Sequence, residues 1–130
     1  MAAFKSWDDC VRIAEKIVEV APKNSFGWIH RSFALHELKR TQEARALLLP
    51  AAHRFPKQDI ICYNLACYEC QLGNTEAARE WLKKSMQLKK PGIIKARALS
   101  DEDLKPMWAE IERMQIPVKQ RGTDTPPGVE

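Results

Sequence analysis

The sequence has only five glycines, and none of them belongs to a glycine-rich loop. This excludes the nucleotide-binding loops in which closely spaced glycines let backbone N–H groups surround phosphates. The apolar runs are a few residues long, whereas a membrane-spanning helix needs about 20 residues. The N-terminus carries charges where a signal peptide would need its apolar region. We therefore expect a cytoplasmic protein that contacts no membrane.

Histidine is also scarce, and its placement argues against catalysis. The three histidines, His30, His36 and His53, have no serine, cysteine or carboxylate at a sequence spacing that fixes a catalytic dyad or triad. Isolated histidines on helices are usually surface or packing residues. We therefore expect no enzyme activity and no catalytic residues, and nothing in the sequence requires a cofactor.

Three of the four cysteines lie close together in the sequence. Cys62, Cys67 and Cys70 have the C-x4-C-x2-C spacing of plant-type iron–sulfur proteins. On a helix that turns by about 100° per residue, however, Cys62 and Cys67 lie about 140° apart and cannot converge on one cluster. No second cysteine pair or His-x3-His accompanies them for zinc. We expect independent, reduced thiols and no metal site.

What the sequence does contain is helical periodicity, with no convincing strand alternation. Its 45% hydrophobic and 29% charged residues are typical of one ordinary globular domain. Ser6, followed by Asp9, has the capping-box spacing that starts a helix. The expected helices span residues 7–20, 26–38, 41–54, 59–72, 75–88 and 93–99. A last helix within residues 100–114 requires Pro106 to lie in its first turn.

These helices indicate an internal repeat of 34 residues. A shift of 34 aligns identical residues at places where two helices must meet, namely Pro22 with Pro56, Leu38 with Leu72, Thr41 with Thr75, and Ala44 with Ala78. Cys10 occupies the position that precedes Ala44 by the same interval. We therefore expect residues 7–22 to form half a repeat, followed by two full repeats.

The repeat resembles the tetratricopeptide-repeat family, in the form of a small bacterial member, over about residues 7–88. The matching positions are Trp28 for the opening aromatic residue, Leu65-Ala66 for the Leu-small pair, Gly73 for the turn glycine, Ala44 and Ala78 for the crossing alanines, and Pro22 and Pro56 for the closing prolines. The resemblance implies an all-α fold, a right-handed α-α superhelix of antiparallel helix pairs with a C-terminal capping helix. The implied domain covers residues 1–114, with a half repeat at 7–22, repeats at 23–56 and 57–90 and a cap at 91–114, and a disordered tail is expected at 115–130.

Two of the expected helices carry a second apolar stripe, although one stripe suffices to pack a helix. The second stripes consist of Phe26, Ile29, Phe33 and His36 on one helix, and of Ile60, Tyr63, Cys67 and Cys70, with Asn64 beside them, on the other. In the tetratricopeptide family, the first helices of successive repeats line a concave face that binds partner peptides. The resemblance thus implies a non-catalytic protein–protein interaction module, an adaptor or scaffold whose groove binds an apolar or aromatic segment of an unidentified protein.

Three alternatives stay open. The second stripes could be covered by flanking helices or the tail, or they could form a homodimer, which a short array with open ends would favour. The net charge of +4 permits an anionic partner without requiring one. Nucleic-acid binding would use the basic sector 83–97, formed by Lys83, Lys84, Lys89, Lys90, Lys95 and Arg97. We expect it to be the weaker reading, because no aromatic residues are interleaved with these charges.

Two details of packing can also be predicted. Arg31 and Glu69 stand where the resembled family usually has an apolar and an aromatic residue. We expect them either to approach each other between repeats or to reach solvent separately. We also expect Cys62 to be packed internally, so that Cys67 and Cys70, on the inner face, react faster with a thiol reagent.

Overall fold

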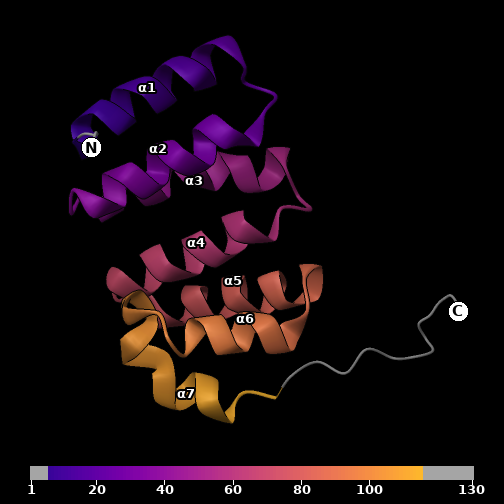
Figure 1. The fold of residues 1–130 in the computed structure, drawn as a ribbon. Helices are drawn as coiled ribbons and strands as arrows, with labels where there is room; N and C mark the ends of the chain where they lie inside the picture. Colours follow the sequence, from indigo (N-terminus) through magenta and orange to yellow (C-terminus); the bar gives the residue numbers. More distant parts are fainter. Residues whose placement is uncertain (1–5, 116–130) are drawn as a thin grey trace, which may run out of the picture.

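The computed structural model of the protein describes residues 6–115, and these residues form helices joined by short loops (Figure 1). The helices are α1 (Trp7–Val20), α2 (Ser25–Glu37), α3 (Thr41–Arg54), α4 (Asp59–Gln71), α5 (Thr75–Leu88), α6 (Pro91–Ala98), the 3-10 helix η1 (Glu102–Met107) and α7 (Trp108–Arg113). No strand occurs within residues 6–115. The all-α prediction is therefore confirmed, and the predicted helix ends agree to within about two residues. Of the expected tail, residues 116–130 lie outside the described residues.

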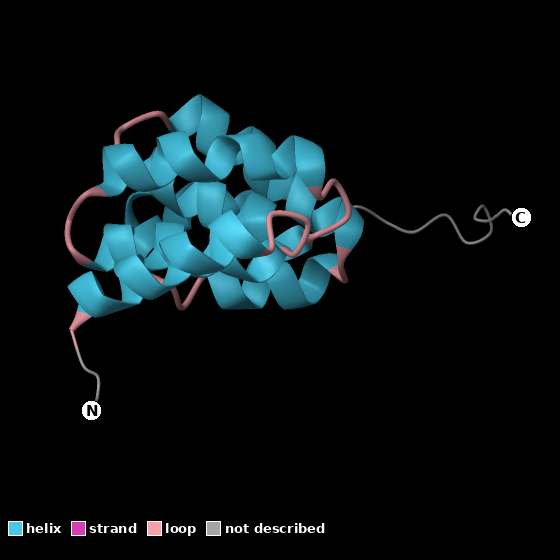
Figure 2. Cartoon of the chain, turned by 90° about the horizontal axis from the view of Figure 1, so that it is seen from above, coloured by secondary structure: helices cyan, strands magenta, loops and turns pink. Residues whose placement is uncertain are grey.

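The helices are stacked in chain order, from α1 at one end to α7 at the other, and the direction reverses from each of the first six to the next (Figure 1). Figure 2 views this stack from its α1 end. The bounds of α1, α3 and α5 coincide after shifts of 34 residues, and so do the bounds of α2 and α4. Each of α1 to α5 packs against the next helix along the chain, which for α5 is the shorter helix α6. None of the described helices combines the length and apolarity needed to cross a bilayer.

The helix ends follow from local capping. Ser6 Oγ accepts a hydrogen bond from Asp9 N at 3.1 Å, and Asn24 Oδ1 accepts one from Phe26 N at 2.9 Å. The turns after α2 and α4 each need a residue with positive φ, which is Lys39 (67°) in the first and Gly73 (84°) in the second. Only glycine adopts this conformation without steric cost. The two turns therefore share one geometry but not one residue type.

The core is a continuous layer of leucine, isoleucine and alanine between the helices. Leu35, Leu48, Leu65 and Leu82, one from each of α2 to α5, are fully buried. At Gly27, α1 and α2 approach so closely that an added Cβ would lie 2.9 Å from Ile17 Cγ2 and from the backbone nitrogen of Val18. This close approach fixes α1 against α2 and thereby places the N-terminal end of the stack.

The C-terminal segment covers the last helices, but not in the way that the sequence suggested. The expected single helix is divided, because residues 102–107, including Pro106, form a 3-10 helix before α7 begins. Leu104, Met107 and Ile111 are buried, and Trp108 Nε1 donates to the carbonyl oxygen of Ala98 at 2.9 Å. Whereas α6 packs on α5, η1 packs on α4. Part of the face that α4 was expected to offer to a partner is therefore covered by the chain itself.

The expected pairing of Arg31 with Glu69 is wrong. Glu69, which is 2% exposed, accepts hydrogen bonds from Arg45 Nε at 2.9 Å and from Asn74 Nδ2 at 2.8 Å. Arg31 donates to the carbonyl oxygen of Leu47 at 3.3 Å, and its guanidinium lies 5.2 Å from the centre of the Trp28 ring. Both charged groups thus find partners nearer than each other.

Candidate functional site

An aromatic surface lies at the α1–α2 end of the stack. It consists of Trp7 from α1 and of Phe26, Ile29, His30 and Phe33 from α2. Phe26 is 52% exposed, and Phe33 and Trp7 are each 42% exposed. The Trp7 and Phe33 rings meet edge to face with centroids 5.7 Å apart, and the Phe26 ring lies 4.0 Å from that of His30. Three large aromatic side chains therefore remain accessible over one helix pair.

The matching part of α4 is closed. Tyr63, Cys67 and Cys70, which the sequence assigned to an open groove, are buried where η1 packs on α4. The Tyr63 hydroxyl donates to Asp101 Oδ2 at 2.8 Å, and the Arg97 guanidinium lies 4.5 Å from the centre of its ring. Of the two predicted stripes, only the one on α2 therefore keeps exposed apolar side chains, because the C-terminal segment covers the one on α4.

His36 also contacts the C-terminal segment that covers α4. Its Nε2 lies 2.9 Å from Asp103 Oδ2, and its Nδ1 lies 2.9 Å from Thr41 Oγ1. Gln71 Nε2 donates to the carbonyl oxygen of Asp103 at 2.8 Å. The imidazole therefore joins α2, α3 and η1 and has no ring nitrogen left for a partner. Of the other predicted groove residues, Ile60 and Asn64 are half-buried on α4.

Thr41, His36 and Asp103 form a hydroxyl–imidazole–carboxylate chain that the sequence spacing did not reveal. Such a chain can activate a nucleophile where the hydroxyl faces a substrate. Here the His36 side chain is only 10% exposed, and the three groups come from α2, the start of α3 and η1. The arrangement supports a latch between elements. Sequence reasoning missed it because Asp103 is 67 positions from His36.

Cys67, Asp101 and Asp103 bring one sulfur and two carboxylates within 4.8 Å of one another. The hydrogen bonds of Asp101 account for both of its oxygens, since Oδ1 accepts from Asp103 N at 3.0 Å and Oδ2 from Tyr63. Burial raises the pKa of the Cys67 thiol, and the Asp101 carboxylate raises it further. The contacts at this position are those of a capped turn, in which Asp101 caps η1.

The expected difference among the thiols is also wrong. Cys62, Cys67 and Cys70 are all buried, and burial raises the pKa of each. Cys10 on α1 is only half-buried. Because accessible thiols react fastest, we now expect a thiol reagent to modify Cys10 before the other three.

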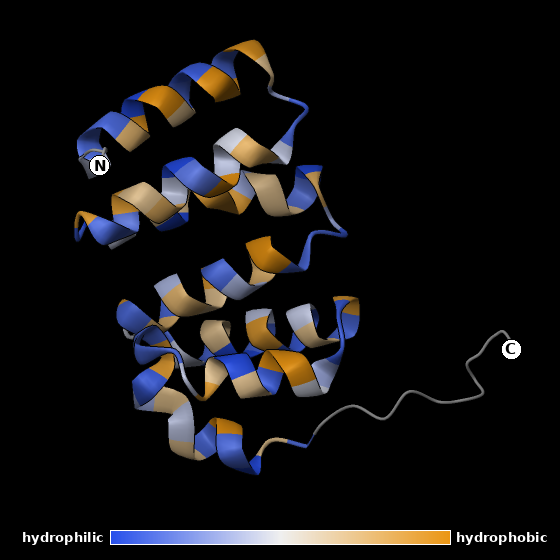
Figure 3. Cartoon of the chain, in the orientation of Figure 1, coloured by the Kyte–Doolittle hydropathy of each residue, from blue (hydrophilic) through white to orange (hydrophobic). Residues whose placement is uncertain are grey.

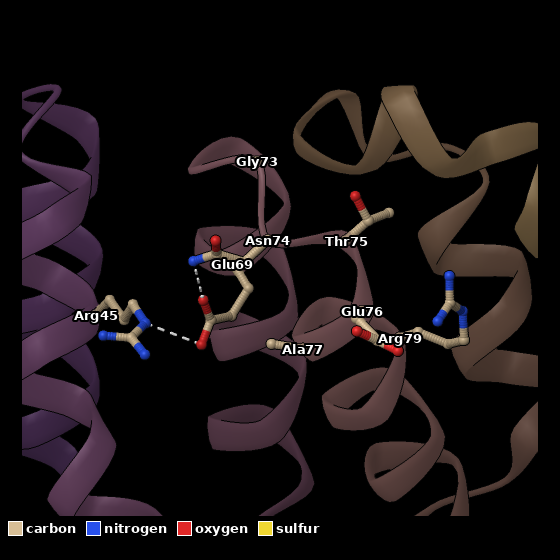
Figure 4. A pocket seen from close by; sticks show the side chains of 8 residues that line it. All are labelled: Arg45, Glu69, Gly73, Asn74, Thr75, Glu76, Ala77 and Arg79. Atoms are coloured by element: carbon tan, nitrogen blue, oxygen red, sulfur yellow. Dashed lines mark hydrogen bonds and ion pairs between the residues drawn. The ribbon is translucent and has the colours of Figure 1, made fainter.

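A polar cleft of about 690 Å³ lies where α3, α4 and α5 meet (Figure 4). Its lining includes Glu69, which accepts hydrogen bonds from Arg45 and Asn74, and Arg79, which pairs with Glu110 of α7. The sequence did not point to this cleft. Of its charged groups, Arg45 pairs with Glu69 and Arg79 pairs with Glu110, so these contacts join α3 to α4 and α5 to α7.

The basic sector 83–97 is discontinuous. Lys83, Lys84, Lys89 and Lys90 are exposed, but Lys95 Nζ donates to the carbonyl oxygens of Glu112 and Met114, at 3.0 and 2.9 Å. The Arg97 guanidinium lies over the buried ring of Tyr63, but Arg97 itself stays exposed. One of the six cations, Lys95, therefore serves an internal contact, and the other five remain exposed.

No family model matches the chain, and no curated protein does. The tetratricopeptide resemblance therefore depends on the residues quoted above. Among the described residues, the exposed large apolar side chains lie on α1 and α2, apart from Ile93 on α6. The α1–α2 end is accordingly the strongest candidate for a functional surface.

Proposed function

We propose that this chain is a non-catalytic protein-interaction module of the tetratricopeptide type, which binds an apolar or aromatic segment of a partner protein. The observation that carries the proposal is the exposure of Phe26 and Phe33 on one face of α2, extended by Trp7 from α1. Aromatic side chains supply much of the binding energy at protein interfaces, because they bury large areas at low entropic cost. A cytoplasmic location belongs to the same proposal and is compatible with four free cysteines.

The proposed architecture is a right-handed superhelix of half a repeat, two repeats and a cap. Its support is the recurrence of helix bounds after 34 residues and of a positive-φ residue at Lys39 and Gly73. In such an array the first helix of each pair contributes to a common inner face. The structure differs from a fully open groove in that the C-terminal segment covers α4, so the proposed binding surface is limited to the aromatic surface.

The proposal can be tested by affinity capture with the immobilised chain from a cell extract. The double variant Phe26→Ser/Phe33→Ser removes two exposed aromatic rings without opening the core. The matched control is Ile93→Ser, because Ile93 is 52% exposed, as Phe26 is, but lies on α6. We expect partners to be retained by the wild type and by Ile93→Ser, and lost from the double variant. Tyr63 is unsuitable as a test position because it is buried.

Two results would contradict the proposal. The first is capture of the same proteins, in the same amounts, by the wild type and the double variant. The second is a wild-type chain that sediments as a dimer while the double variant sediments as a monomer. That result would identify the aromatic surface as a contact between two copies of the chain.

A further inference from the structure

A second apolar surface runs along α1, outside the aromatic surface. We define it as the α1 edge, formed by Cys10, Ile13, Ile17 and Val20. Ile13 is 61% exposed and Val20 is 72% exposed, while Cys10 and Ile17 are half-buried. Figure 3 shows hydrophobic residues recurring along α1, which is the first helix of the stack. Ile17 lies beside Gly27 of α2 and Cys10 packs against the core, so Ile13 and Val20 form the exposed part of the α1 edge, and no described helix precedes α1 to cover them.

The chain itself shows what covers the equivalent positions of other helices. Shifts of 34 and 68 residues turn the α1 edge into Ala44, Leu47, Ala51 and Arg54 on α3, and into Ala78, Trp81, Ser85 and Leu88 on α5. Among these equivalent positions, the apolar residues of α3 and α5 are all less exposed than Ile13 and Val20. Four of the positions are fully buried, namely Ala44, Ala51, Ala78 and Ser85. Helix α2 precedes α3 in the chain and packs on it, and α4 precedes α5 and packs on it in the same way.

Direct contacts place α2 on two of these positions of α3, Leu47 and Arg54. Arg31 of α2 donates to the carbonyl oxygen of Leu47, and the Arg54 guanidinium lies 5.2 Å from the centre of the Trp28 ring. The positions equivalent to Leu47 and Arg54 on α1 are Ile13 and Val20. The equivalent site on α3 is thus occupied by an antiparallel α-helix, α2, and α4 packs on α5 in the same way along the chain (Figure 1).

We infer that the α1 edge binds one amphipathic α-helix of a partner protein, antiparallel to α1, in the position that α2 has on α3. This inference rests on the proposed function, since it names the partner class of an interaction module. Helix-in-groove binding uses apolar anchors at helical spacing. Both α2 and α4 bury a small residue near their middle, Ser32 and Ala66, with Trp28 or Cys62 four residues earlier. The partner helix is therefore expected to carry an apolar residue followed, four positions later, by a small one.

Charge contributes little to this recognition. On the solvent side of α1, Arg12 pairs with Asp9 and Lys16 pairs with Glu19, each three positions apart. These pairs include Arg12 and Glu19, the sequence neighbours of Ile13 and Val20, and they leave Asp8 and Glu15 as the two acidic residues of α1 in excess. Binding driven by apolar burial is insensitive to moderate salt, unlike binding to a polyanion.

Cys10 provides a built-in probe, because it lies in the α1 edge and is the least buried of the four cysteines. The ligand for the test is a synthetic peptide that copies residues 23–40, with both ends blocked, since this segment contains the helix that occupies the equivalent site. Alkylation of Cys10 in the full chain is followed by mass spectrometry with increasing peptide. We expect the alkylation rate to fall by about tenfold at saturation, since a covered thiol reacts only after local opening.

Two matched controls define the site. A peptide carrying Ser32→Lys replaces the small middle residue and is expected to protect Cys10 poorly. The protein variant Ile13→Glu places a charge in the α1 edge without disturbing the buried face of α1, and it is expected to abolish protection by the wild-type peptide. Unchanged Cys10 alkylation across the soluble range of peptide concentration would overturn the inference. The inference would also be overturned if the wild-type and Ser32→Lys peptides protected Cys10 equally, or if the wild-type peptide protected Cys10 equally in the wild-type protein and in Ile13→Glu.

Other outcomes separate this inference from the proposed function. If sedimentation shows a wild-type dimer that Ile13→Glu dissociates, the occupant is a second copy of the chain and the partner-helix inference is wrong. If Ile13→Glu captures the same cellular proteins as the wild type and the peptide gives no protection, the inference fails while the aromatic surface retains its role. If Cys10 is protected but Phe26→Ser/Phe33→Ser captures partners normally, the α1 edge is supported and the aromatic surface is not.

Discussion

His36 Nε2 lies 2.9 Å from Asp103 Oδ2, so the last turn of α2 is joined to η1 across 67 positions of sequence. The same imidazole contacts Thr41 at the start of α3. Together with the hydrogen bond from Tyr63 to Asp101, this contact holds the C-terminal segment over α4. The closed part of the inner face therefore depends on two carboxylates that follow α6 closely.

Replacing His36 by alanine should loosen this closure. We expect a loss of roughly 1–3 kcal/mol in the free energy of unfolding, because Asp103 and Thr41 lose their partner in a partly buried site. Urea denaturation measures the loss, and faster alkylation of Cys67 reports opening of η1. The control is His30→Ala, on an exposed ring of α2, which should change stability by less than about 0.5 kcal/mol. Equal effects of the two substitutions would contradict a latch at His36.

A double-mutant cycle should distinguish the observed partner of Glu69 from the expected one. Removing Arg45 leaves a carboxylate that is 2% exposed without its cation, which should cost about 3–5 kcal/mol. We expect strong coupling between Arg45→Met and Glu69→Gln, and coupling near zero between Arg31→Met and Glu69→Gln. Unfolding free energies of the single and double variants provide the test. Coupling between Arg31 and Glu69 would restore the sequence-based prediction.

Comparison of the predicted with the observed helices and contacts shows which features a sequence can predict. The helices were predictable because Ser6, Gly73 and Pro91 act locally, and the 34-residue period places Ala44 and Ala78 in equivalent positions. The part of the candidate site that lies on α2 was predictable for the same reason, because apolar periodicity identifies the apolar faces of α2 and α4. Which face stays open was not predictable.

The reason is that closure depends on a distant segment. Nothing within α4 indicates that Asp101 will accept a hydrogen bond from Tyr63, 38 positions away. The same holds for Glu69, whose choice between Arg31 and Arg45 depends on how α2 and α3 are placed relative to α4. Local periodicity gives the direction of a side chain on its own helix but not the neighbour that it meets.

Alkaline pH should destabilise the chain. Burial raises the pKa of the Cys62, Cys67 and Cys70 thiols above their ordinary value of 9.0, and that of Tyr63 and Tyr68 above 10.0. The folded state thus keeps protons that the unfolded state releases. The resulting stabilisation is complete below about pH 9 and is lost as pH rises towards the folded pKa values.

The slope of this loss can be measured by urea unfolding between pH 7 and 10.5. Each group that keeps its proton only when folded should contribute about 1.4 kcal/mol per pH unit above its unfolded pKa. Cys67→Ala should lower the free energy of unfolding at every pH, because it removes a buried side chain. Above pH 9, however, its free energy of unfolding should fall less steeply than that of the wild type, by about 1.4 kcal/mol per pH unit, because one titrating group is gone. Parallel curves for Cys67→Ala and the wild type would show that the thiol titrates alike in both states.

The turns after α2 and α4 allow opposite substitutions to be compared. Lys39 has a φ of 67° and Gly73 a φ of 84°, although only glycine adopts such values without a penalty of about 1–2 kcal/mol. Lys39→Gly should therefore stabilise the chain by about 0.5–1 kcal/mol after allowing for the greater unfolded-state entropy of glycine. Gly73→Ala should destabilise it by about 1–2 kcal/mol, entirely through the backbone, because no atom lies within 4 Å of the added Cβ. Thermal or urea unfolding that ranks Lys39→Gly below the wild type would refute the shared turn geometry.

The contact of α1 with α2 leads to the last prediction, which separates helix propensity from packing. Glycine within a helix normally costs about 1 kcal/mol relative to alanine, so Gly→Ala should stabilise wherever space permits. At Gly92 of α6 an added Cβ meets nothing within 4 Å, and Gly92→Ala should raise stability by up to about 1 kcal/mol. At Gly27 the same Cβ would lie 2.9 Å from Val18 N, a backbone atom that cannot rotate away. Gly27→Ala should therefore push α1 from α2 and cost about 1–3 kcal/mol despite its better propensity.

A displaced α1 would also move Trp7 away from Phe33, whose rings are 5.7 Å apart. Gly27→Ala should consequently change the near-ultraviolet circular dichroism of the aromatic residues, whereas Gly92→Ala should leave this signal unchanged. If both substitutions stabilised the chain to the same extent, α1 could not pack on α2 as closely as the structure describes. The aromatic surface and the α1 edge would then lose their common support, because both depend on α1 being fixed at Gly27.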